Sequence, residues 1–196
     1  ARRCVYATGG VEAAIGEGWV VAGANYSGGE EAWIPRVMVR RRSDEAPLAS
    51  TFVAVIEPYE GSSNIAGIRR LTLATREGSR FGENHIAVEV VLVDGRRDLL
   101  MAADAEAPSG PAPSWRESGA VVAPERDVET DAELCFVRTG RDGQSRRVVL
   151  AGGSYLRVGE ARLELSERTE FVELEEEDGK WHVVGGAGEV VQELPP

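Results

Sequence analysis

Residues 50–59 read Ser-Thr-Phe-Val-Ala-Val-Ile-Glu-Pro-Tyr, an apolar run that ends in a charged residue, a proline and an aromatic. Threonine and the β-branched residues favour an extended backbone, and Pro58 cannot donate a hydrogen bond to a sheet ladder. The residue before a proline is also restricted to extended geometry. The sequence therefore predicts a strand that finishes near Pro58, with a core formed by Phe52, Val53, Val55 and Ile56.

The same extended pattern continues on both sides of this stretch. Period-two alternation and short apolar runs recur, and no window carries apolar residues at helical spacing over three turns. We therefore predict an all-β protein. The predicted strands cover residues 19–25, 33–42, 51–58, 65–75, 85–93, 97–103, 119–123, 133–139, 146–151, 154–158, 162–166, 171–175 and 181–184.

Turn signals separate these strands. The pairs Asp94-Gly95, Asp142-Gly143 and Asp178-Gly179 each lie between two extended runs, where residues that tolerate positive φ close a tight hairpin. Gly152-Gly153-Ser154 is also predicted to form a hairpin turn. Because no crossover helices are available for a parallel sheet, the pattern indicates an antiparallel β-sandwich with little or no helix.

The chain has 196 residues, and we predict a single β-sandwich domain over residues 1–196. Because residue 1 is alanine, we expect the chain to be a piece of a longer protein. Ala105–Ser114, which is rich in proline, is either a linker or a long surface loop. We favour the loop, since a boundary there would leave about 80 residues of hairpins with a small core.

The net charge of −11 lies in the later part of the chain: residues 1–75 hold eight basic and eight acidic side chains, whereas residues 76–196 hold 14 basic and 25 acidic ones. Such a field disfavours phosphate backbones, so nucleic acid is not an expected partner. No apolar run approaches the roughly 18 residues that a membrane-spanning helix needs, and we expect no membrane span. An anionic glycan is compatible with the neutral first part, which carries Arg36, Arg40, Arg41, Arg42, Arg69 and Arg70.

Reactive side chains are few. The two histidines, His85 and His182, lie far apart with no motif around either, so we expect structural or surface histidines and no metal site. Cys4 and Cys135 allow one disulfide or two free thiols, and the apolar run around Cys135 is typical of a buried small side chain. No phosphate-binding Gly-Lys-Ser/Thr loop and no Gly-x-Ser-x-Gly elbow occur. The sequence predicts no cofactor.

Four stretches occur in a characteristic order: residues 35–41, residues 50–59, residues 87–91 with 97–104, and residues 149–153 with Tyr155 and Leu156. In this order they resemble the C-terminal β-sandwich of the heparinase II/III-like polysaccharide lyases. The resemblance implies a sandwich of the super-sandwich type. It also implies a parent enzyme that cleaves acidic polysaccharide by β-elimination at a uronic acid.

In that family most catalytic residues lie in a helical toroid that precedes the sandwich, and this chain contains no such helical domain. The resemblance therefore implies a chain that has no catalytic residues, contacts an upstream helical domain, and meets acidic polysaccharide through the parent enzyme. It implies a secreted or periplasmic location. It also places Glu57 and Tyr59 at the cleft, where Tyr59 would stack on a sugar ring and Glu57 would accept a hydrogen bond. The histidine-rich metal site of the family has no match here.

Arginines of one predicted strand are the other candidates for glycan contact. Arg36, Arg40 and Arg42 share a parity and should project from one face. Val37 and Val39 should then lie in the core on the other face, with Arg41 near the strand end. The alternative is a solvated arginine row on an ordinary strand.

Three hypotheses for function follow. The leading one is a non-catalytic C-terminal β-sandwich of a heparinase II/III-like lyase, which contributes scaffold and part of an acidic-glycan cleft. The second is a stand-alone carbohydrate-binding sandwich, which contiguous exposed tryptophans among Trp19, Trp33 and Trp115 would favour. The third, a complete small glycosidase or lyase, needs two convergent acids, or a tyrosine and a histidine in one pocket.

Overall fold

The computed structural model describes residues 2–6, 11–21, 31–44, 48, 50–104 and 119–192. The predicted loop Ala105–Ser114 and Trp115 lie outside these residues. By their internal contacts the residues form two compact units, one of Ala7–Ser50 and one of Ala1–Tyr6 with Thr51–Pro196.

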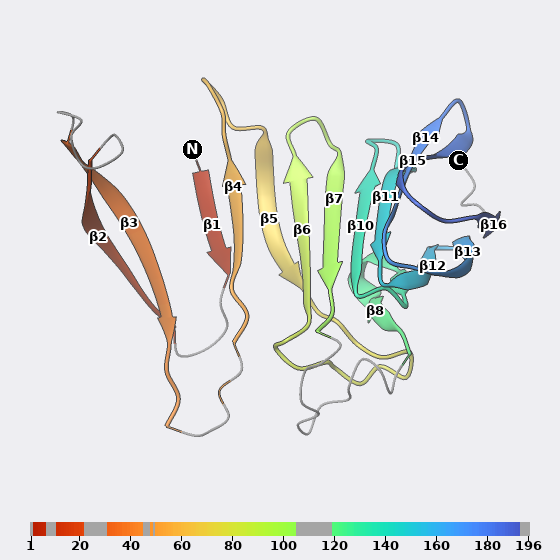
Figure 1. The fold of residues 1–196 in the computed structure, drawn as a ribbon, viewed down its shortest axis with the longest axis horizontal. Helices are drawn as coiled ribbons and strands as arrows, with labels where there is room; N and C mark the ends of the chain where they lie inside the picture. Colours follow the sequence, from red (N-terminus) through yellow and green to blue (C-terminus); the bar gives the residue numbers. More distant parts are fainter. Residues whose placement is uncertain are drawn as a thin grey trace. The chain divides into compact units, whose positions relative to one another are not determined.

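The described part of the chain is all-β, as predicted, and its strands pair in antiparallel fashion (Figure 1). The larger unit contains a two-stranded sheet of β1 (Arg2–Tyr6) and β4 (Val53–Glu57). A seven-stranded sheet has the order β15-β14-β11-β10-β7-β6-β5, and a five-stranded sheet has the order β16-β13-β12-β9-β8. The seven-stranded sheet consists of β5 (Ile65–Leu71), β6 (Ile86–Leu92), β7 (Arg97–Ala102), β10 (Leu134–Thr139), β11 (Ser145–Ala151), β14 (Val172–Glu177) and β15 (Lys180–Gly186). The five-stranded sheet consists of β8 (Val121–Ala123), β9 (Val128–Thr130), β12 (Gly153–Val158), β13 (Ala161–Thr169) and β16 (Val190–Gln192).

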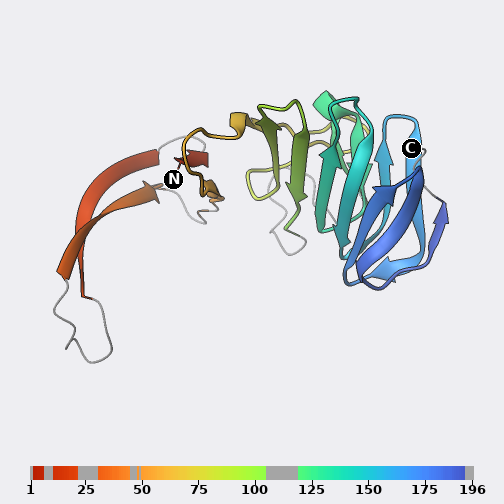
Figure 2. The ribbon, with the colours of Figure 1, turned by 90° about the horizontal axis from the view of Figure 1, so that it is seen from above.

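The core lies between these two sheets, which form the layers of a β-sandwich (Figure 2). Alternate residues of each strand point inward, as the period of a strand requires. Leu150 and Leu174 from the seven-stranded sheet meet Leu156 and Leu163 from the five-stranded one, and none of the four exposes any surface. Cys135 belongs to the same core as a free thiol, and burial raises its pKa to about 12.

The three Asp-Gly pairs close hairpins, as predicted, between β6 and β7, β10 and β11, and β14 and β15. The prediction of a hairpin turn at Gly152-Gly153-Ser154 was wrong. Strand β11 before it belongs to the seven-stranded sheet and β12 after it to the five-stranded sheet, so the chain changes layer there. Gly152 has φ +61°, and a Cβ on Gly153 would lie 2.5 Å from the Cα of Ala132. The glycines therefore permit a tight crossing between layers.

Strand β4 ends at Glu57, directly before Pro58, as predicted. The prediction that Phe52 and Ile56 lie in the core was wrong. Phe52, directly before β4, is 47% exposed, and Ile56 is 62% exposed. Val53 and Glu57 are buried on one face with Val55 half-buried between them, whereas Ala54 and Ile56 are exposed on the other face. A strand covered on one face cannot bury neighbours of both parities.

The smaller unit contains a two-stranded ribbon of β2 (Val11–Val21) and β3 (Glu31–Arg41). Strand β2 begins eight residues before the predicted start. The prediction started too late because Gly16 and Gly18 interrupt the alternating pattern in the sequence. The Arg36 side chain lies over Gly18, where a Cβ would lie 2.0 Å from Arg36 Nε, and this exposed side chain would have to move to admit a larger residue. The prediction that Val37 and Val39 lie in the core was wrong: Val37 is 47% exposed and Val39 is half-buried, because the ribbon has no second layer among the described residues of its own unit.

Candidate functional site: a cationic pocket between the sheets

A buried carboxylate lies on the inward face of β6. Glu89 has the same parity as Ala87, a core residue, and its side chain is only 2% exposed. Its partners in the sheet are Arg69 on β5 and Leu99 on β7. A carboxylate on the inner face of a sandwich must be paired and hydrogen-bonded to remain charged.

Two arginines supply the hydrogen bonds. Arg69 Nε donates to Glu89 Oε2 at 2.7 Å, and Arg126 Nη2 donates to the same oxygen at 2.8 Å while its Nε donates to Oε1. Arg126 ends the short 3-10 turn η2 (Pro124–Arg126), which connects β8 and β9 of the other sheet. Burial by itself would raise the pKa of Glu89, but hydrogen bonds and charge from Arg126 and Arg69 outweigh it and lower that pKa to about 2.

A third arginine faces the same carboxylate more loosely. Arg97 Nη1 lies 3.6 Å from Glu89 Oε1, and the Arg97 side chain is 46% exposed. Among the described residues Glu89 is the one acidic partner of Arg97, and the 3.6 Å between Nη1 and Oε1 is too long for a hydrogen bond. Its guanidinium donors are therefore available to a ligand.

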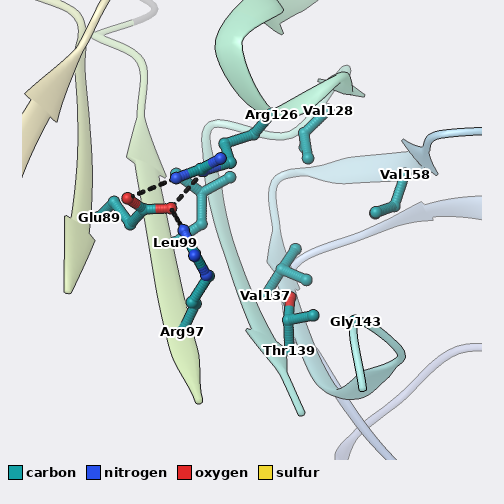
Figure 3. Close-up of a pocket in the computed structure, with 9 residues that line it drawn as sticks. All are labelled: Glu89, Arg97, Leu99, Arg126, Val128, Val137, Thr139, Gly143 and Val158. Carbon is teal, nitrogen blue, oxygen red and sulfur yellow. Dashed lines mark hydrogen bonds and ion pairs between the residues drawn. The ribbon is translucent and has the colours of Figure 1, made fainter. Parts of the chain in front are cut away.

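Arg97 and Arg126 stand at the rim of a pocket of about 150 Å³ (Figure 3). Both sheets contribute to it: Leu99, Val137 and Thr139 from one, and Val128 and Val158 from the other. Gly143 of the β10–β11 turn completes the lining. The pocket thus combines an aliphatic interior with a cationic rim.

The charges of this cluster do not cancel. Arg69, Arg97 and Arg126 face Glu89, and Arg69 lies 3.5 Å from Glu125, so among the residues that the structure describes three positive groups meet two negative ones. A further anion at Arg97 would complete the balance, and a guanidinium can bind a carboxylate through two parallel hydrogen bonds. Glu89 itself is a poor proton acceptor near neutral pH, because its pKa lies near 2.

Histidines do not join this pocket. His85 is buried, its Nδ1 accepts a hydrogen bond from the Asp104 amide at 3.1 Å, and its ring packs edge-on against Phe81. Burial lowers the pKa of His85 despite the nearby Asp104. His182 is exposed on β15. Among the described residues, no group of three or more His, Cys, Asp or Glu side chains converges as a metal site would require.

A second ionic network lies on the outer face of the five-stranded sheet. Glu129 on β9 pairs with Arg76 and Arg157, and Tyr155 lies beneath the guanidinium groups of Arg76 and Arg162 at 5.9 and 5.2 Å from its ring centre. Burial, followed by a hydrogen bond with Glu129, raises the pKa of Tyr155 to about 12. The acids and arginines of this network are paired with one another, so we interpret it as a structural network.

The predicted arginine row belongs to the β2–β3 ribbon. The register places Arg36 opposite Gly16 and Arg40 opposite Glu12, so the two arginines share one face, as predicted. Arg40 forms an ion pair with Glu12, and both side chains are 57% exposed. Arg42 is exposed directly after the strand. The exposure of these arginines is compatible with both alternatives, a glycan contact and a solvated arginine row.

The predicted cleft residues Glu57 and Tyr59 belong to the larger unit and differ in their exposure. Glu57 is buried, and its carboxylate accepts hydrogen bonds from Ser63 Oγ at 2.7 Å and from the Asn64 amide at 2.6 Å. It therefore holds the turn between β4 and β5. Tyr59 is 41% exposed after the end of β4, where its ring is accessible.

Two tryptophans of the ribbon are directly opposed. Trp19 and Trp33 are register partners, and they are 46% and 65% exposed. The indole N–H of Trp19 donates to Glu31 at 3.2 Å. Residues on the same face include Ile15 and Val37, both exposed.

Sequence reasoning missed the Glu89 pocket. The available signal was a glutamate within the apolar run Ile86–Leu92, at the parity of its inward residues. Arg69 and Arg97 were visible as charged residues on neighbouring strands, but Arg126 reaches the site from the other sheet.

No protein-family model matches this chain, and no curated protein matches its sequence. Within the described residues no helix is long and apolar enough to cross a membrane.

Proposed function

We propose that this chain is a non-catalytic C-terminal β-sandwich of a heparinase II/III-like polysaccharide lyase, and that it binds acidic polysaccharide at the Glu89 pocket. The order of the resembling stretches in the sequence supports the family, and the all-β antiparallel sandwich is compatible with it. In this proposal the chain acts as a scaffold beside an upstream helical domain, which carries the chemistry.

The observation that carries the binding role is the excess of guanidinium groups around Glu89. Arg97 faces solvent at the pocket rim with donors to spare, on a protein whose net charge is −11. Such a local excess attracts the carboxylates of a polyuronate even though the whole molecule repels anions at long range. The predicted contact residues, Arg36, Arg40, Arg42, Glu57 and Tyr59, do not line this pocket, and the proposal adds Arg97 as a separate contact.

We expect this chain alone to have no lyase activity. β-Elimination needs a positioned base and a group that neutralises the substrate carboxylate. Arg97 could meet the second need, but the acid beside it has a pKa near 2. We expect no unsaturated uronate product when residues 1–196 are incubated with heparan sulfate, alginate or hyaluronan.

Binding of oligouronates to the Arg97→Gln variant tests the proposal. Losing one charge-assisted hydrogen bond should weaken binding roughly tenfold at low salt, and the difference should shrink as salt rises. Arg162→Gln is the matched control, because Arg162 is 51% exposed and pairs with Glu164 on the outer face of the other sheet. Both variants lose one positive charge. Equal effects of the two would contradict the assignment to this pocket.

The second candidate, a stand-alone carbohydrate-binding module, is favoured by the Trp19–Trp33 pair. Two exposed indoles side by side can stack on sugar rings. Under this alternative Trp33→Ala would abolish glycan binding, while Arg97→Gln would leave it unchanged.

A further inference from the structure

The interior of the Glu89 pocket differs chemically from its rim. Four aliphatic side chains form the interior: Leu99, Val128, Val137 and Val158. The polar groups stand at the edge, where Arg97 and Arg126 lie on one side and Thr139 on another (Figure 3). A bare carboxylate would use the rim and leave the interior empty.

The pocket's size limits what can enter. A cavity of about 150 Å³ holds a group of roughly six carbon atoms. A sugar ring with its hydroxyls would bury polar groups against aliphatic walls without hydrogen bonds, which is unfavourable. A short substituent that ends in a methyl group avoids this cost, while the ring that carries it stays outside near Arg97.

We infer that the pocket receives the acetyl substituent of an acetylated acidic glycan, while a carboxylate of the same glycan binds Arg97. This inference rests on the proposed function and deepens it by naming the ligand class. The acetyl methyl packs among Val137, Val158 and their aliphatic neighbours, and the acetyl carbonyl accepts a hydrogen bond from the Thr139 hydroxyl. O-acetyl and N-acetyl groups share this chemistry.

The gain expected from the acetyl group is modest and measurable. Burial of one methyl and formation of one neutral hydrogen bond together favour the acetylated ligand by roughly tenfold. The carboxylate contact with Arg97 is common to acetylated and deacetylated ligands. The ratio of the two affinities therefore reports the pocket interior and not the rim.

The test compares O-acetylated oligomannuronate with the same preparation after mild alkaline de-esterification, by calorimetric titration of the chain. A parallel arm compares a hyaluronan oligosaccharide with its N-formyl analogue, which lacks only the methyl group. A preference of roughly tenfold in the first arm, or of roughly fourfold in the second arm, where only the methyl group is lost, supports the inference and identifies the acetyl type. Equal affinities in both arms overturn it.

Two variants place the effect in the pocket. Val158→Phe fills the interior, and Thr139→Val removes the hydroxyl with little change of shape. Each should reduce the preference toward unity while the deacetylated ligand binds as before, and unchanged folding of either variant is checked by circular dichroism. A preference that survives in both variants overturns the inference. Failure of all ligands to bind contradicts the proposed function itself, whereas acetyl-independent binding that still needs Arg97 contradicts this inference alone.

Discussion

Replacing Glu89 by glutamine removes the charge that three arginines surround, and it leaves the side-chain shape almost unchanged. The wild-type carboxyl has a pKa of about 2 in the folded protein against 4.5 for the ordinary group. At about 1.4 kcal/mol for each tenfold change in proton affinity, its ionised form stabilises the fold by about 3 kcal/mol near neutral pH. Since the side chain is 2% exposed, little of this is lost to solvent screening. We expect Glu89→Gln to lower the free energy of unfolding by about that amount.

The sign of the pH dependence follows from the lowered pKa. The stabilisation is fully present above the unfolded pKa and is lost as pH falls from there through the folded value of about 2. The wild type should therefore lose its advantage over the variant progressively in acid. Near pH 3 the difference should have fallen to about half of its neutral value.

Urea unfolding of both proteins near pH 7 and near pH 3, followed by far-ultraviolet circular dichroism, gives this difference directly. Glu125→Gln is the control, because Glu125 is 43% exposed and lies 3.5 Å from Arg69. Its replacement should change stability by less than about 1 kcal/mol. Equal stability of Glu89→Gln and wild type near neutral pH, or a difference that does not narrow in acid, would show that the Glu89 carboxylate does not stabilise the fold.

Other consequences concern the core, the layer crossing and the buried thiol. Leu150→Ala should lower the free energy of unfolding, measured in urea, by about 2–5 kcal/mol, because Leu150 is fully buried, whereas Phe52→Ala should lower it by less than about 1 kcal/mol. Similar losses for the two variants would show that the core has been placed wrongly. Gly153→Ala should destabilise the protein by about 1–3 kcal/mol, because the added Cβ would meet the backbone of Ala132. Gly67→Ala is the control, because a Cβ there meets nothing within 4 Å. Equal stability of the two variants would exclude the close approach of Gly153 to Ala132. Cys135 should resist alkylation in native buffer and react in urea, since burial raises its pKa to about 12; peptide mass spectrometry measures this, and rapid native labelling would contradict its burial.

The class of fold could be predicted from local signals. Alternation and three Asp-Gly turns identified the antiparallel strands and hairpins, because both depend on residues adjacent in sequence. The short strands β9 and β16 escaped prediction, since three residues carry too little periodicity. The Gly152-Gly153 turn was assigned wrongly, because glycine shows that the backbone bends but not which sheet the next strand joins.

The candidate site was harder to predict than the fold class. It depends on which alternate residues of each strand face inward and on which side chains the opposite sheet contributes. The charge of Arg40 suggested a ligand, yet its register partner Glu12 pairs with it. Glu57 suggested a cleft acceptor, yet the next turn uses both of its oxygens. Glu89 acquires its importance only when Arg126 approaches from the other sheet.

Binding of acidic glycan at the Glu89 pocket, as we propose, can be followed residue by residue. Backbone amide chemical shifts of the labelled chain, followed during titration with an oligouronate at low salt, test it most directly. We expect shifts that cluster at Arg97, Arg126, Thr139 and Gly143, and that disappear in Arg97→Gln. Shifts confined to Trp19, Trp33 and their neighbours on the ribbon, or no shifts at all, would contradict it.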